Sequence, residues 1–169
     1  MESESPMDAI ITFIGVSIVS VAILGVVLGF SVTPPPDTNA AANTIDSTAT
    51  SHDRMLATYD HGADAYWMDT QQIALKNDGG ERHASIAFGE ITPVAHTEAA
   101  TNSDNEKLLR VTHSGDWQGE FENETAFLEA TSKARTDSLN GQGQWQPASG
   151  KLTVRTVTAD NQTVTLVAA

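Results

Sequence analysis

The residues best suited to chemistry gather between positions 52 and 64. Histidine and aspartate side chains, which bind divalent cations through nitrogen and oxygen, stand there within 13 residues of one another: His52, Asp53, Asp60, His61 and Asp64. Their spacing matches no metal-binding motif, however, and aspartate is common throughout the chain. We therefore predict a solvated acidic loop here and no metal site.

The rest of the sequence offers little for catalysis. It has no cysteine, which excludes disulfides, thiolate metal sites and cysteine nucleophiles. His113 and Ser114 are adjacent in sequence, which is not how a histidine base activates a serine. The sequence contains no phosphate-binding loop, nucleophile elbow or HExxH motif. We predict a non-enzymatic protein without a cofactor. Its three tryptophans mark either the core and its margin, which we favour, or a binding face: Trp67, Trp117 and Trp145.

Two N-x-T sequons offer another kind of chemistry, the attachment of a glycan. Asn161 stands in a predicted hairpin turn, where a glycan fits, whereas Asn123 is also a candidate N-cap of a helix. Both matter only if this part of the chain lies outside the cell. We retain both as candidate glycosylation sites.

Acidic residues outnumber basic ones by 22 to 9, which gives a formal charge of −13. That balance excludes nucleic acid as a partner, because nothing in it would neutralise phosphates, and it disfavours anionic lipid headgroups. The acidic residues are spread along the chain, and lysine is scarce. A dispersed acidic surface keeps a protein hydrated in concentrated salt, where screening weakens self-repulsion. The composition favours a halophile's protein, with an ordinary acidic protein as the alternative.

An apolar segment over residues 9–32 follows an acidic tail over residues 1–8. The segment holds 24 residues without a charge, and as a helix it spans about 36 Å, more than the ~30 Å hydrocarbon core of a bilayer. A cleaved signal peptide would have a basic start and a shorter apolar core. We predict a retained single transmembrane helix in the cell membrane, with the following domain outside the cell. Gly25 and Gly29 form a G-x-x-x-G pair that either packs against another membrane helix or is incidental.

Three consecutive prolines end the apolar segment and begin a stalk over residues 33–64, which contains either a short helix capped near Asp37 or a linker. Residues 65–169 predict one small domain. Its expected elements are, in order, strand 65–76, strand 81–94, a polar loop 96–107, a helix from Asn123 to Gly141, and a hairpin of strands 151–158 and 162–169. The expected fold is α+β: a transmembrane helix, then a small antiparallel sheet of two hairpins with one packed helix.

The overall pattern resembles an uncharacterised haloarchaeal family of short, single-span membrane proteins. The resemblance rests on the acidic start, the single span, the abrupt "TPPPDTNAAANTID", the hairpin "IALKNDGGERHASIAFGEITPV" and the ending "KLTVRTVTADNQTVTLVAA". It covers essentially the whole chain, and its motifs are structural rather than catalytic. It implies an association with archaeal type IV pilus-like or secretion machinery.

The expected function is therefore that of a pilin-like accessory subunit anchored in the membrane. Its partners would be the lipid bilayer, other membrane helices and subunits of the pilus system. The start "MESESPMDAII" lacks the basic leader of archaeal prepilins, which argues against a major pilin. The competing expectation is an independent cell-envelope domain that binds a ligand or a cation.

Overall fold

The computed structural model describes residues 14, 17, 33–51, 55–95, 103–141 and 144–169. Apart from two residues, the predicted tail 1–8 and the predicted transmembrane segment 9–32 lie outside the described part of the chain, and so do Gly25 and Gly29. Within the described part, no helix is both long enough and apolar enough to cross a membrane.

The chain divides into two units, Met1–Thr33 and Pro34–Ala169. The elements described in the second unit are the helices α2 (Thr38–Ala49), α3 (Ser103–Ser114) and α4 (Glu124–Asn140), and the strands β1 (Leu56–Asp60), β2 (Ala65–Met68), β3 (Gln72–Asn77), β4 (Gly80–Ser85), β5 (Ile91–Val94), β6 (Gln146–Pro147), β7 (Lys151–Ala159) and β8 (Gln162–Ala168). Because α2 and β1 belong to this unit, the boundary falls at Pro34, whereas the sequence had suggested a stalk up to residue 64.

The strands form two four-stranded sheets. Sheet A has the strand order β1-β7-β8-β5, and sheet B has the order β4-β3-β2-β6. All neighbouring strands are antiparallel except β5, which runs parallel to β8. The α+β class is confirmed, as are the turns that join β3 to β4 and β7 to β8. The prediction of a single sheet with one packed helix was wrong, since both sheets and all three described helices belong to the unit.

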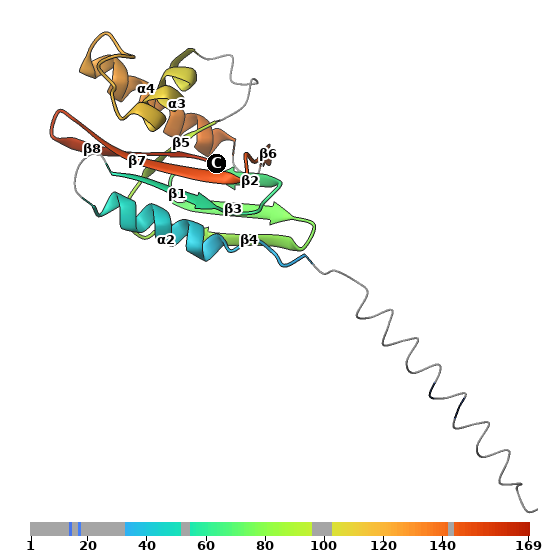
Figure 1. Cartoon of the computed structure of the whole chain (residues 1–169). Helices are drawn as coiled ribbons and strands as arrows, with labels where there is room; N and C mark the ends of the chain where they lie inside the picture. The colour runs from blue at the N-terminus through green and yellow to red at the C-terminus, as the bar shows by residue number, and fades with distance from the viewer. Residues whose placement is uncertain (1–13, 15–16, 18–32, 52–54, 96–102, 142–143) are drawn as a thin grey trace, which may run out of the picture. The chain divides into compact units, whose positions relative to one another are not determined.

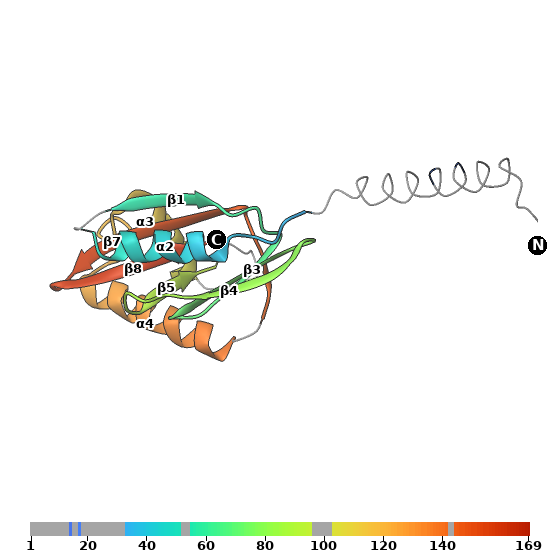
Figure 2. The same cartoon turned by 90° about the horizontal axis from the view of Figure 1, so that it is seen from below.

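Sheet A lies at the centre of the unit, with helices α3 and α4 on one face and helix α2 together with sheet B on the other (Figures 1 and 2). Two clusters of buried side chains fill these spaces. The cluster on the α2 side includes Ile45, Ile73, Leu75, Ile91, Leu152 and Val154. The cluster on the α3–α4 side includes Leu108, Val111, Phe127, Val157, Val164 and Leu166. Strands β7 and β8 therefore bury both of their faces, and alternate residues point into different clusters.

Helices α2 and α4 begin at the caps that the sequence suggests. The Asp37 carboxylate accepts a hydrogen bond from the Ala40 N–H at 3.0 Å, so the alternative of a linker here is wrong. At α4 the Asn123 Oδ1 accepts from the Ala126 N–H at 2.9 Å, and Gly141 follows the last helical residue. The predicted helix from Asn123 to Gly141 is confirmed.

Two predicted strands are in fact broken, each by an aspartate that binds backbone N–H groups. The Asp69 carboxylate accepts from Gln71 and Gln72 at 2.7 Å each, and this turn divides strand 65–76 into β2 and β3. Asp46 of α2 accepts from the N–H groups of two residues that follow β4, Ala87 and Phe88, which turns the chain away from sheet B. The chain then continues as β5 in sheet A. The strand predicted over 81–94 therefore contributes to both sheets.

Helix α3 corrects the last part of the loop predicted over residues 96–107, whereas residues 96–102 lie outside the described part of the chain. It begins at Ser103, and Asp104 and Glu106 lie in its first turn, where a carboxylate interacts favourably with the helix dipole. Leu108 and Val111 are buried against sheet A. Polar composition concealed this helix because only a narrow stripe of it, three residues apart, faces the core.

Candidate functional site

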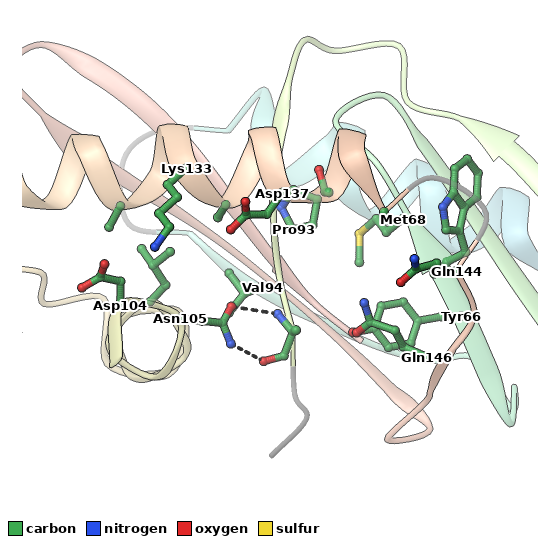
Figure 3. A pocket seen from close by; sticks show the side chains of 17 residues that line it. Tyr66, Met68, Pro93, Val94, Asp104, Asn105, Lys133, Asp137, Gln144 and Gln146 are labelled. Carbon is green, nitrogen blue, oxygen red and sulfur yellow. Dashed lines mark hydrogen bonds between the residues drawn. The ribbon is translucent and has the colours of Figure 1, made fainter. Parts of the chain in front are cut away.

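A pocket of about 320 Å³ opens where α3 and α4 meet strands β2 and β5 (Figure 3). Residues from the segment just before β6 complete its wall. Its apolar lining includes Met68, Pro93, Val94, Leu108, Ala130 and Ala134. A pocket with an apolar floor and a few convergent polar groups is the usual form of a small-molecule site.

The two helices place three charged side chains and an asparagine at this pocket. Asp104 and Asn105 come from α3, and Lys133 and Asp137 come from α4 (Figure 3). Lys133 and Asp137 are four residues apart, so they lie on the same face of the helix, and both are exposed at the pocket mouth. The helices therefore give the pocket one cationic and two anionic groups.

The sheet side of the pocket carries neutral hydrogen-bonding groups. Tyr66 on β2 donates its hydroxyl hydrogen to Gln146 Oε1 at 3.0 Å. Gln144 lies beside them, and Figure 3 shows the three side chains on the opposite side of the pocket from Lys133 and Asp104. A ligand in the pocket would thus meet charged groups at one end, and amides and a phenol at the other.

Strand β5 forms one wall of the pocket with an edge that is already closed. At its start the Ile91 N–H donates to the Thr70 carbonyl at 2.9 Å. Just beyond its end, the Asn105 side chain makes two hydrogen bonds with the backbone of Ala95, at 3.1 and 2.7 Å. Pro93 lies between them, and its backbone faces the same edge as Ile91 and Ala95, but proline has no N–H. An extended peptide cannot add to this edge as a further strand, so the pocket suits a compact ligand.

A row of aromatic rings adjoins the pocket on the outward face of sheet B. Trp67 and His83 have ring centroids 6.1 Å apart, and His83 and Trp145 are 6.4 Å apart. Strand register places Ala74 between Trp67 and His83, and this alanine is fully buried although it lies on the outward face. Since β2 and β4 are separated by about 9–10 Å as next-but-one strands, the two rings must lean toward each other over Ala74.

The structure separates the histidines and aspartates that the sequence groups around residues 52–64. His52 and Asp53 lie outside the described residues. His61 is 4% exposed, whereas Asp60 and Asp64 are exposed, so the prediction of a fully solvated loop was wrong for His61. Within the described part of the chain, no three His, Asp or Glu side chains are placed to hold a metal ion.

His61 is a buried neutral imidazole. Its Nδ1 accepts a hydrogen bond from the Ala63 N–H at 3.0 Å, which leaves the proton on Nε2. Burial lowers the pKa of His61, and the nearby Asp60 carboxylate opposes that shift without cancelling it. Among the described residues no acceptor meets His61 Nε2, and the buried Nε1 of Trp67 is also unpaired. Each unpaired buried donor costs about 1–3 kcal/mol.

The two sequon asparagines are exposed, and they differ in backbone setting. Asn161 lies in the β7–β8 turn, where it and Asp160 both have positive φ, as a type I′ turn requires. Asn123 uses its Oδ1 to cap α4, so the glycan-accepting Nδ2 is not the atom that makes the cap.

Residues 4–157 match the family of unknown function DUF7283. The chain belongs to this family. No curated protein and no solved structure matches it. Because the DUF7283 family has no assigned function, membership assigns no activity, and the function must be argued from the pocket and the surfaces beside it.

Sequence reasoning did not predict this pocket, and it assigned Trp67 to the core or its margin in preference to a binding face. Asp104 and Asn105 were placed in a loop, and Lys133 and Asp137 were read only as parts of a helix. The spacing of Lys133 and Asp137 placed both side chains on one face of the predicted helix but did not indicate a pocket there. Nothing in the sequence showed that α3 would pack alongside it.

Proposed function

We propose that this DUF7283 member is a non-enzymatic binding protein of the cell envelope, attached to the membrane through the apolar segment 9–32. The pocket between α3, α4, β2 and β5 would hold a small polar ligand. The observation that supports this proposal is the convergence of Asp104, Lys133 and Asp137 with Tyr66 and Gln146 on a pocket with an apolar floor.

Among the described residues, the lining of the pocket lacks a serine or cysteine nucleophile with a histidine base. The lining residues include neither histidine nor cysteine, and their single serine, Ser138, has its hydroxyl bonded to the Arg135 carbonyl at 2.8 Å. A nucleophile activated by a neighbouring base is therefore not assembled from these side chains.

A pocket-filling substitution tests this proposal. Ala134 lines the pocket on α4, and Thr136 lies two residues away and is exposed. Ala134→Phe should fill the pocket, whereas Thr136→Phe places the same ring in solvent. The full chain in nonionic detergent is titrated with glucose, N-acetylglucosamine, glycine betaine and glutamate. At least one of them should raise the melting temperature of the wild type and of Thr136→Phe by several degrees at saturating concentration, but not that of Ala134→Phe.

Two results would contradict the proposal that the pocket binds a ligand. If every probe that stabilises the wild type also stabilises Ala134→Phe, or if no probe stabilises either protein, the pocket is not a ligand site.

The absence of cysteine allows a direct test of membrane location. Ser149 is exposed on the second unit, so Ser149→Cys introduces a single thiol. Labelling of intact cells by a membrane-impermeant maleimide would support an external domain, and labelling only after lysis would contradict it. Intact mass of the wild type against Asn161→Gln would also report whether a glycan is attached there.

A specific surface feature favours a second function, that of a pilin-like accessory subunit. Phe88 is 58% exposed at the tip of the segment that joins β4 to β5. Its N–H and that of Ala87 donate to the Asp46 carboxylate at about 3.0 Å, which fixes the tip against α2. A large apolar side chain held on a fixed backbone is typical of an anchor residue in a protein interface.

Photo-crosslinking tests the accessory role. Benzoylphenylalanine at position 88 should crosslink to a pilus-system subunit in intact cells. The same substitution at Leu139, which is 47% exposed on α4, serves as the control. Equal crosslinking from both positions, or crosslinks only to unrelated proteins, would argue against this role. Self-association through the membrane segment is tested separately by the Gly25→Leu, Gly29→Leu double variant.

A further inference from the structure

We propose that the pocket and the aromatic row on sheet B form one elongated site for a neutral saccharide chain. The terminal sugar would occupy the pocket, and the next units would stack on Trp67 and Trp145. This inference rests on the proposed binding function and specifies its ligand.

The pocket and the row are continuous. Trp67 lines the pocket and is also the first ring of the row. Gln144 and Gln146, the residues on either side of Trp145, line the pocket as well. A ligand that leaves the pocket along the outward face of sheet B therefore passes directly from amide side chains to indole rings.

The rings are held in place before any ligand arrives. The Glu81 carboxylate lies 2.5 Å from His83 Nε2 and fixes the imidazole between the two indoles. Lys76 places its ammonium 5.7 Å from the centre of the Trp145 ring, within the range of a cation–π contact. Alanines lie opposite these residues in the register, namely Ala74 beside Trp67 and Ala65 beside Lys76. The small side chains leave room for the rings to lie across the strands.

The chemistry of this surface suits sugars. The negative face of an aromatic ring attracts polarised C–H bonds, and one face of a pyranose ring presents several of them. Carboxylate and amide groups pair with neighbouring hydroxyls, since each carboxylate accepts more than one hydrogen bond and each amide both donates and accepts. Asp104, Asp137 and Gln144 supply such groups in the pocket.

Charge narrows the class of saccharide. The pocket lining has two carboxylates and one ammonium group, and the whole chain carries a formal charge of −13. An anionic polymer, such as a polyuronate or a nucleic acid, would be repelled. A peptide is also disfavoured, because Asn105 and Pro93 close the strand edge that it would pair with. A neutral saccharide meets none of these obstacles.

Calorimetric titration of the full chain in nonionic detergent tests the inference. The probes are glucose, N-acetylglucosamine, and the tetramers maltotetraose, cellotetraose and chitotetraose, with a polyuronate as the anionic comparison. At least one tetramer should bind about tenfold more tightly than its monomer, because only the tetramer reaches the rings. Its affinity should change little between about 1 M and about 3 M KCl, because a neutral ligand carries no charge for salt to screen.

Variants assign each part of the site. Trp145→Ala should reduce the affinity for the tetramer to that of the monomer and leave the monomer unaffected, whereas Trp145→Phe should retain most of the advantage. Ala134→Phe should abolish binding of both. Phe88→Ala, which removes an exposed aromatic ring elsewhere, should change neither.

Three outcomes would overturn the inference, and they are distinguishable from failure of the proposed function. If the monomer and the tetramer bind with equal affinity, and Trp145→Ala changes neither affinity, the extension over the aromatic row is rejected and the pocket alone remains as the ligand site. Binding of glycine betaine or glutamate alone, abolished by Ala134→Phe, would reject the saccharide class but keep the binding function. If the polyuronate binds more tightly than the neutral tetramers, and salt weakens its binding, the proposal that the saccharide is uncharged is rejected. Only the lack of any ligand sensitive to Ala134→Phe would reject both proposals.

Discussion

The two sheets of this protein have four strands each but are covered differently. Sheet A lies between α3–α4 and the layer of α2 and sheet B, so its central strands β7 and β8 are buried on both faces. Sheet B packs one face against that core and turns the other outward, where Trp67, His83 and Trp145 gather. The comparison indicates that sheet A carries most of the stability, and that sheet B is free to present a surface.

Burial on both faces of sheet A extends to polar residues, and two of these, Arg155 and Thr156, have fixed hydrogen-bond partners. Arg155 donates from Nε to the Thr112 carbonyl at 3.1 Å and from its terminal nitrogen to the His113 carbonyl at 2.6 Å, so it closes the C-terminal end of α3. Burial lowers the pKa of Arg155. Thr156 accepts from the Met55 N–H at 3.0 Å. At Arg155 and Thr156, therefore, the buried polar groups of sheet A are satisfied by a fixed partner.

The largest expected effect is at the centre of sheet A. Leu166 on β8 is fully buried, so Leu166→Ala should lower the free energy of unfolding by about 2–5 kcal/mol. The matched variant Leu56→Ala, on the edge strand β1, removes a side chain that is 46% exposed and should cost less than about 1 kcal/mol. Denaturant unfolding measures both values. Similar losses at the two positions would refute the assignment of stability to the centre of sheet A.

A second test concerns the contact between α3 and sheet A. Gly115 follows α3 with a φ of +76°, and a Cβ added there would lie 2.9 Å from a guanidinium nitrogen of Arg155. Gly115→Ala should therefore cost more than the ~1–2 kcal/mol of left-handed backbone strain alone. Gly62, with a φ of +58° and no atom within 4 Å of its added Cβ, isolates that strain. Equal losses for the two alanine variants would show that Arg155 moves aside without cost.

A third test uses pH. His61 has a lowered pKa in the folded protein, so the unfolded chain takes up this proton first as the pH falls through about 6.5. The contribution of neutral His61 to the free energy of unfolding is therefore fully present above that pH. It is lost as the pH falls toward the folded pKa, by at most about 1.4 kcal/mol per pH unit for one proton. His61→Asn keeps an acceptor for the Ala63 N–H and should flatten this part of the profile. A wild-type profile that matches the variant's would contradict the assignment.

The smallest effect on stability is expected on the outward face of sheet B. His83 is 53% exposed in its side chain, so His83→Ala should change the free energy of unfolding by less than about 1 kcal/mol. The same variant should weaken binding of the tetramers, because it removes the ring between the two indoles. A stability loss as large as that of Leu166→Ala would mean that the aromatic row is a small core rather than a binding surface.

Local signals in the sequence predicted local structure well. The Asn123 cap and the Asn140–Gly141 end of α4 are where the residue types indicate, because a cap is decided by its own side chain and its nearest backbone groups. The same is true of the β7–β8 turn at Asp160 and Asn161. In each case the interaction that determines the structure lies within a few residues.

Long-range partners explain what the sequence did not predict. The bend after β4 depends on Asp46, about 40 residues earlier, and no property of the bend itself indicates that partner. Helix α3 is polar overall and becomes a helix in the fold because Leu108 and Val111 find sheet A. The pocket joins residues from β2, β5, α3 and α4, so it could be recognised only after both helices had been placed on the same face of sheet A.

The closed edge of β5 affects how copies of this protein associate when they are crowded together. Open strand edges are the places where folded β proteins join one another and aggregate. At β5 the first outward N–H is bonded to Thr70, the second is missing at Pro93, and the third is bonded to Asn105. Many copies confined side by side on one surface would therefore meet at this wall of the pocket without their sheets fusing, and each copy would keep its pocket open.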